Sequence, residues 1–200
     1  MHRRKWFLVL AAGAMAAPSP VRSQPAAGAP VTASTAVRAA ANDNTQSAGV
    51  LKDGVLSLHL VAQPVTWYPE AEDGPTQVVE AFGEAGKGPS VPGPLIRIPL
   101  GTTIDATITN SLPDTLVVLG LRGRNDSLRI APNGVATLRY KPPTAGSFLY
   151  AGSDVRDGRI RFGGTRGQLV GGLIVDAGPP PKDRIFIATG WDPVPIAGNP

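Results

Sequence analysis

The chain has 200 residues, of which 19 are basic and 15 are acidic, and it contains no cysteine. It can therefore form no disulfide, and it offers no thiolate as a metal ligand or nucleophile. Four basic residues and no acidic residue lie in the first 23 positions, so the remainder carries 15 residues of each sign. Such a neutral chain has no general electrostatic attraction for nucleic acid or for an anionic membrane.

The N-terminus has the pattern of a secretory signal. Arg3, Arg4 and Lys5 precede an apolar stretch of about a dozen residues, which is too short to span a bilayer. Small side chains near Ser23 place cleavage there. The adjacent arginines also resemble a twin-arginine signal, so both export routes stay open, with an uncleaved membrane anchor as the alternative. We expect residues 1–23 to be removed and the protein to be periplasmic or extracellular in a bacterium, touching a membrane only through its signal.

Residues 24–49 are polar and small, and carry almost no large apolar side chain. Such a segment cannot bury enough surface to offset its ordering entropy, which predicts a disordered linker. A folded domain is expected over residues 50–176. Its apolar segments are short, rich in β-branched residues and separated by Gly and Pro, and no sustained helical period appears.

The predicted strands are residues 55–62, 77–81, 95–98, 103–109, 115–121, 127–130, 135–140, 147–150 and 169–175. The clearest is 103–109, whose alternation turns Ile104, Ala106 and Ile108 inward. Residues 132–134, with the sequence Pro-Asn-Gly, predict a hairpin turn. Short strands at regular spacing favour an all-β Greek-key sandwich or small barrel.

After Asp176 a proline-rich stretch leads to an apolar run at residues 183–189. This run looks like the first strand of another domain, but only a polar segment follows it. Residues 177–200 are therefore interpreted as a linker and the start of a second, truncated domain, and the chain as a fragment of a longer protein.

Five collinear segments carry a family pattern. Residues 91–102 resemble P-G-P-x-I-R-V-x-x-G-D, residues 104–113 resemble V-x-V-x-V-x-N-x-L, residues 131–140 resemble an I-x-P-G hairpin, residues 144–150 resemble P-G-T-Y-W-Y, and residues 168–176 resemble Q-x-x-x-G-L-x-G-A-L-I-V. In this order they resemble the first cupredoxin domain of multicopper oxidases, over about residues 77–176. The resemblance implies a cupredoxin-like fold and, as partners, downstream cupredoxin domains of the same protein. A homo-oligomer is also compatible with the sequence.

The chain departs from the family at the copper ligands. The resemblance implies His-x-His before a Gly-Leu pair and again after the W-Y pair, because imidazole suits copper and alternate residues of a strand face one way. Those positions hold Val117 and Leu119, and Ala151 and Ser153. We therefore expect no catalytic residue, metal site or cofactor in this chain, with copper only in a full-length protein.

The remaining chemistry-bearing residues form weaker patterns. His59 is expected on the polar face of a strand, in solvent. The four arginines of the last loop could contact an anion or a partner, or be solvated and balanced by nearby acids; they are Arg156, Arg159, Arg161 and Arg166. The glycine-rich residues 83–88 and the acidic residues 70–73 are interpreted as ordinary loops.

Three functions remain open at this stage. The first is a domain without copper ligands in an exported protein similar to multicopper oxidases. The second is a copper-free structural or interaction protein of the cell envelope from the same superfamily, and the third is an exported binding domain that stands alone. Whether the full-length protein is an enzyme is undecided.

Overall fold

The computed structural model describes residues 37–123, 126–156, 159–161 and 167–191. The expected signal peptide and residues 24–36 lie outside this part of the chain. Almost all regular structure in the described part is β-strand, and no helix there is long and apolar enough to cross a membrane. The predicted all-β sandwich class is confirmed.

The described strands follow one another with short connections. In chain order they are β1 (Val37–Arg38), β2 (Ala40–Ala41), β3 (Val50–Lys52), β4 (Val55–Trp67), β5 (Gln77–Glu84), β6 (Gly88–Val91), β7 (Ile96–Pro99), β8 (Thr103–Asn110), β9 (Leu116–Leu119), β10 (Ser127–Ile130), β11 (Val135–Tyr140), β12 (Gly146–Arg156), β13 (Arg159–Arg161) and β14 (Val170–Asp176).

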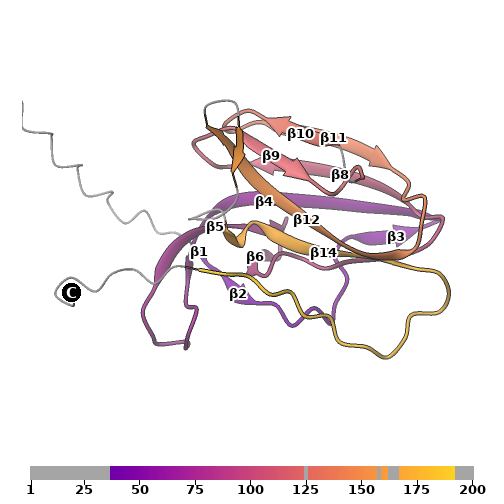
Figure 1. Ribbon diagram of the computed structural model, residues 1–200, viewed down its shortest axis with the longest axis horizontal. Coiled ribbons are helices and arrows are strands. Elements are labelled where there is room, and N and C mark those ends of the chain that lie inside the picture. Colours follow the sequence, from indigo (N-terminus) through magenta and orange to yellow (C-terminus); the bar gives the residue numbers. More distant parts are fainter. Residues whose placement is uncertain (1–36, 124–125, 157–158, 162–166, 192–200) are drawn as a thin grey trace, which may run out of the picture. The chain divides into compact units, whose positions relative to one another are not determined.

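Two sheets form the sandwich (Figure 1). The first sheet has the order β11-β8-β4-β5-β6-β2, with β1 and β3 also paired to the long strand β4. The second sheet has the order β10-β9-β12-β14-β7, with β13 paired to β12. Most pairs are antiparallel. The parallel pairs are β4 with β8, β4 with β1, β14 with β7 and β2 with β6. Sequence neighbours are thus often in different sheets, as in a Greek-key arrangement.

The main core lies between the inner faces of the two sheets. The alternation predicted for residues 103–109 is observed, because Ile104, Ala106 and Ile108 are fully buried. Leu56, Leu58 and Leu60 of β4 join them in the same cluster, while the intervening residues of β4 face outward. Period-two patterning therefore produces both the strands and the core.

Tyr150 of β12 is the largest side chain that is fully buried in this core. Its ring lies 5.4 Å from the ring of Phe82, centroid to centroid, and its hydroxyl donates a hydrogen bond to the carbonyl oxygen of Pro94. Burial raises the pKa of the Tyr150 hydroxyl far above its ordinary value. The hydroxyl therefore stays protonated and acts as a donor that ties the second sheet to the segment before β7.

Residues 37–49 correct the predicted extent of the linker. They form β1 and β2, which pair with β4 and β6, and Ala39 joins Val65, Val79, Ala81 and Val91 in a second, smaller apolar cluster. Composition alone missed this because the buried side chains of the segment are those of Ala39, Ala48 and the polar Asn44, while the large apolar partners come from strands further along the chain.

Residues 183–191, hereafter the strap, also differ from expectation. Nothing in this segment is assigned as strand. Its side chains nevertheless alternate, with Ile185, Ile187, Thr189 and Trp191 half-buried and the residues between them exposed. The strap runs back along the sandwich (Figure 1), held at Ile185 by the side chain of Asn44. The strand pattern was thus detected, but no neighbouring strand supplies a ladder of backbone hydrogen bonds.

Candidate functional site

The second sheet brings together the four positions at which the resemblance implied copper ligands. In the antiparallel pairing of β9 and β12, Leu119 lies opposite Ala151 and Val117 lies opposite Ser153. Residues directly opposite each other on antiparallel strands have Cβ atoms about 5 Å apart. Positions more than thirty residues apart in sequence thus form two adjacent cross-strand pairs.

These pairs lie on the outward face of the sheet. The residues next to them in sequence belong to the main core, namely Leu116 and Val118 of β9 and Tyr150 of β12. Since successive side chains of a strand point to opposite faces, Val117, Leu119, Ala151 and Ser153 point away from that core. Val117 and Ser153 are nonetheless fully buried, whereas Leu119 and Ala151 are half-buried.

Two glycines allow β9 and β12 to approach so closely. Gly120 has a φ of +84°, and a Cβ there would collide with the carbonyl oxygen of Leu149. Gly152 faces the core, where a Cβ would lie 2.9 Å from the side chain of Leu169. The Gly-Leu pair of the recognised pattern therefore has a local steric reason in this chain.

The residues present at the four positions do not fit copper. Three of the side chains are apolar hydrocarbons and the fourth is a hydroxyl, whereas copper in proteins prefers imidazole, thiolate and thioether ligands. Among the described residues, no group of three or more His, Cys, Asp and Glu side chains is arranged to hold a metal ion.

His59 lies in the other sheet, as expected on the outward face of β4. Its Nε2 atom is 2.9 Å from the hydroxyl of Thr109, and the side chain is exposed. Ser57, two residues earlier, is also exposed. This histidine is therefore a surface residue that takes part in a polar cross-strand contact.

The candidate arginines follow directly on β12. In the hairpin of β12 and β13, Arg156 pairs with Arg159, and Arg161 pairs with Asp154. Arg166 lies outside the described residues. The structure thus brings three of the four arginines to one hairpin that continues the strand carrying Ala151 and Ser153.

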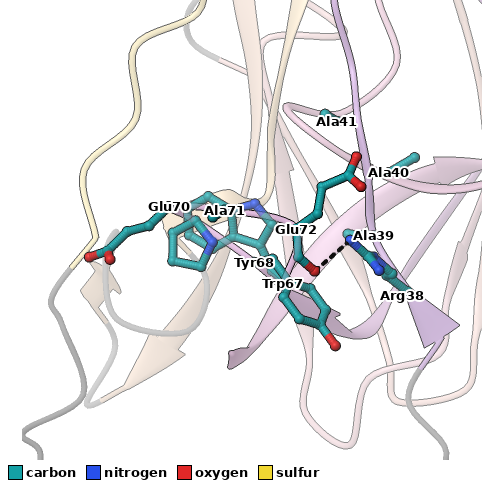
Figure 2. Close-up of a pocket in the computed structure, with 10 residues that line it drawn as sticks. Arg38, Ala39, Ala40, Ala41, Trp67, Tyr68, Glu70, Ala71 and Glu72 are labelled. Atoms are coloured by element: carbon teal, nitrogen blue, oxygen red, sulfur yellow. Dashed lines mark hydrogen bonds between the residues drawn. The ribbon is translucent and has the colours of Figure 1, made fainter. Parts of the chain in front are cut away.

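A pocket of about 590 Å³ lies beside the turn that follows β4 (Figure 2). The Arg38 guanidinium lies over the Tyr68 ring, 4.2 Å from its centroid, and donates a 3.0 Å hydrogen bond to the backbone carbonyl of Glu72. The exposed carboxylates of Glu70 and Glu72 also line the pocket. The arginine thus fixes the turn through a cation–π contact, a role the sequence pattern did not reveal.

Known proteins were compared with the chain. No protein-family model matches it, and no curated protein matches it. Similar solved structures include Lac15 from a marine microbial metagenome, with 23% identity over 63% of this chain and 34% of that one and a TM-score of 0.48. The laccase from Pediococcus acidilactici is 16% identical over 70% of this chain and 31% of its own, with a TM-score of 0.46. The multicopper oxidase from Campylobacter jejuni, described as a metallo-oxidase, is 15% identical over 70% and 30%, with a TM-score of 0.44.

The chain therefore spans about a third of the length of these structures. At such identities and TM-scores the similarity concerns the arrangement of strands in part of each protein. The names laccase, multicopper oxidase and metallo-oxidase describe those proteins.

Proposed function

We propose that this chain is the first cupredoxin-like domain, itself without copper ligands, of an exported protein similar to multicopper oxidases. One observation carries the proposal. The two positions of each implied His-x-His pair fall opposite those of the other pair, and all four hold side chains unsuited to copper. If the two segments matched the family pattern only by chance, there would be no reason for the four positions to lie directly opposite one another on two strands.

Export is supported by the basic and then apolar N-terminus of the sequence. In this proposal the protein works in the periplasm or outside the cell, and its partners are further cupredoxin domains of the same protein. Any copper in the intact protein would be bound by those domains. The role of this domain is then to pack against its partners and not to react.

A copper-free interaction protein of the same superfamily is the second candidate. It is favoured by the apolar character of the outward face at the four positions, since an apolar sheet face usually packs against something. The two candidates differ in the donor residues of the remaining protein, and both assign this domain a packing role.

The first test is copper binding by the chain without its signal, residues 24–200. We expect no stoichiometric binding of Cu(II) by calorimetry, no new visible absorbance and no oxidation of phenols by dioxygen, because imidazole and thiolate donors are missing from the four positions. Tight binding of one or more copper ions per chain would contradict the proposal.

The second test restores donors at one of the registered pairs. The double variant Leu119→His with Ala151→His places two imidazoles opposite each other, so we expect its Cu(II) affinity to rise at least about tenfold and its Tm to rise with added Cu(II). The matched control, Arg129→His with Leu149→His, has as many histidines but places them two strands apart. An equal gain in the control would show that the assigned positions are wrong.

A further inference from the structure

The pocket beside the turn that follows β4 is built from segments far apart in sequence. Residues 38–41 form one side of it, and residues 67–72 form the other (Figure 2). Its volume of about 590 Å³ falls within the range of small-molecule sites, which is about 300–1,000 Å³. The four positions of the implied copper ligands are not among its lining residues. A ligand bound here would therefore be independent of copper.

Trp67 gives this pocket an aromatic wall whose position is fixed. The side chain is half-buried and packs against the second apolar cluster. Its ring also meets the ring of Trp191 edge to face, with the centroids 6.2 Å apart and an angle of 86° between the planes. A ring held in this way offers a flat apolar surface without a further loss of side-chain freedom on binding.

Arg38 supplies hydrogen-bond donors that are also held in place. Its guanidinium lies over the Tyr68 ring and donates one hydrogen bond to the backbone carbonyl of Glu72. A guanidinium carries five N–H donors in one plane, so this bond leaves further donors on the same group. The pocket thus has a positioned donor group next to its aromatic wall.

The acceptors of the pocket are spread out. The carboxylates of Glu70 and Glu72 are exposed, and in Figure 2 the two side chains extend in opposite directions from the turn. Carboxylates that do not converge cannot enclose a metal ion, and the guanidinium of Arg38 repels any cation nearby. Hydroxyl groups arranged around the edge of a ring match this pattern, since each of them both donates and accepts.

We propose that this pocket binds a pyranose sugar, with a C–H face of the sugar ring on Trp67 and hydroxyl groups bonded to Arg38 and Glu72. Because Arg38 and Glu72 are exposed to competing water, we expect weak binding, with dissociation constants of about 0.1 to 10 mM. The proposal requires neither copper nor another domain, so its failure would leave the copper experiments unaffected.

Saturation-transfer difference NMR on residues 24–200 tests the proposal. The probes are the methyl pyranosides of glucose, galactose, mannose and N-acetylglucosamine, each titrated to about 20 mM. At least one of them should bind, with stronger saturation of the C–H protons on one face of its ring. Glycerol, which has hydroxyl groups but no ring, and spermidine, which is a cation without hydroxyl groups, should not displace the bound sugar.

Variants locate the site. Trp67→Leu should weaken sugar binding at least about tenfold, because it removes the aromatic wall. Glu72→Gln should weaken it at least about fivefold, since it replaces the carboxylate but keeps the size of the side chain and the backbone carbonyl that Arg38 binds. The matched control is Phe186→Leu, which removes a ring that is 84% exposed and lies outside this pocket. This control should bind sugar like the wild type.

Three results would overturn the proposal. The first is the lack of binding by all four pyranosides, and the second is an equal loss of binding in Phe186→Leu. The third is displacement of the sugar by spermidine, which would indicate a site for cations. Circular dichroism shows whether each variant is folded, and if Trp67→Leu is not, unchanged binding in Glu72→Gln would itself contradict the proposal.

Discussion

At the scale of single residues, Asn110 shows how one buried polar side chain joins distant segments. The two N–H groups of its amide are shared among the carbonyl oxygens of Asp114, Ile130 and Ala131, which lie 2.9 to 3.1 Å from the amide nitrogen. Its carbonyl oxygen accepts from the backbone nitrogen of Leu112. The side chain is fully buried and its bonding capacity is used. The asparagine in the recognised pattern thus ties the end of β8 to the hairpin at residues 131–134.

Gly171 is a second residue whose identity the packing requires. A Cβ at this position would collide with the ring of Tyr150. The aromatic ring therefore occupies the space next to the β14 backbone where any other residue would place its side chain. Gly171 and Gly172, the paired glycines of the last family segment, therefore both have a steric role. At Gly172 the side chains of the strap pack against the backbone of β14.

Ile108 tests the strand register of β8. Its side chain is fully buried in the main core. We expect Ile108→Ala to lower the free energy of unfolding by about 2–5 kcal/mol, because it removes buried methyl groups and leaves a cavity. Urea denaturation followed by circular dichroism measures the change.

The neighbouring Thr107→Ala is the control for this register. Thr107 is half-buried on the opposite face of the same strand, so its substitution should change stability by only about 0.5 kcal/mol. If Thr107→Ala lowered the free energy of unfolding more than Ile108→Ala, the strand register would be shifted by one residue.

At the scale of elements, the strap is attached to the sandwich by side-chain hydrogen bonds and not by a ladder of backbone hydrogen bonds. Arg97 of β7 donates to Asp176 at 2.8 Å and to Asp183 at 2.7 Å, so one guanidinium joins the end of β14 to the start of the strap. Further along, Gln168 donates to the carbonyl oxygen of Gly190 and accepts from the hydroxyl of Thr189. Attachment of this kind depends on a few polar contacts and is sensitive to their charge state.

The strap should therefore respond to acid. Bonding to Arg97 holds the pKa of Asp183 below its ordinary value of 3.8. A carboxyl with a lowered pKa stabilises the folded arrangement above its unfolded pKa, and this contribution is lost as the pH falls through the folded value. We expect the strap to loosen below about pH 4. Tryptophan fluorescence reports it, because Trp67 and Trp191 are in edge-to-face contact, 6.2 Å apart.

Variants separate the carboxylates that face this region. Asp183→Asn should show the loosened spectrum already at neutral pH. Asp105→Asn, which breaks an exposed pair with Arg139, should leave the acid transition unchanged. The pKa of Asp43 is lowered as well, chiefly by its hydrogen bond from Thr45 and to a small extent by Arg184 of the strap. If Asp43→Asn, and not Asp183→Asn, abolished the transition, the strap would be controlled from the turn at residues 42–45.

At the scale of the whole molecule, the segment before β3 completes the sandwich. Besides the pairings of β1 and β2, Ala48 is buried in the main core, and its backbone nitrogen donates to the carbonyl oxygen of Leu95. The hydroxyl of Ser47 bonds both the backbone nitrogen and the carbonyl oxygen of Arg97, which caps the outer edge of β7. An edge strand that is covered in this way is protected from pairing with another chain.

Truncation tests the contribution of this segment. Compared with a chain that begins at residue 37, a chain that begins at residue 50 should have a Tm lower by about 10 °C or more, because it exposes the second apolar cluster and the edge of β7. Differential scanning calorimetry makes the measurement. Equal Tm values for the two chains would support the original interpretation of residues 37–49 as a linker without a structural role.

Much of the fold could be predicted because local patterns agreed with the final structure. The strands at residues 127–130 and 135–140 have the predicted bounds, and the turn between them has Asn133 at a φ of +55°, as expected for its Pro-Asn-Gly sequence. The patterns did not predict β2 and β6, because burial in these short strands is not periodic or their side chains are small. They predicted a strand in the strap, where no neighbouring strand is available to pair with it.

The sequence by itself determined the all-β class, the alternation that forms the core, the absence of any thiolate and the lack of imidazoles at the positions of the recognised family pattern. Only the tertiary structure decided that these positions form two registered pairs, that they lie on an apolar outward face, and that Arg38 meets the turn after β4 at a pocket. The physical reason is that residue type and period are local properties of the chain. By contrast, contacts between segments far apart in sequence decide which strand pairs with which. They also decide which face of a sheet is buried and which segment covers it.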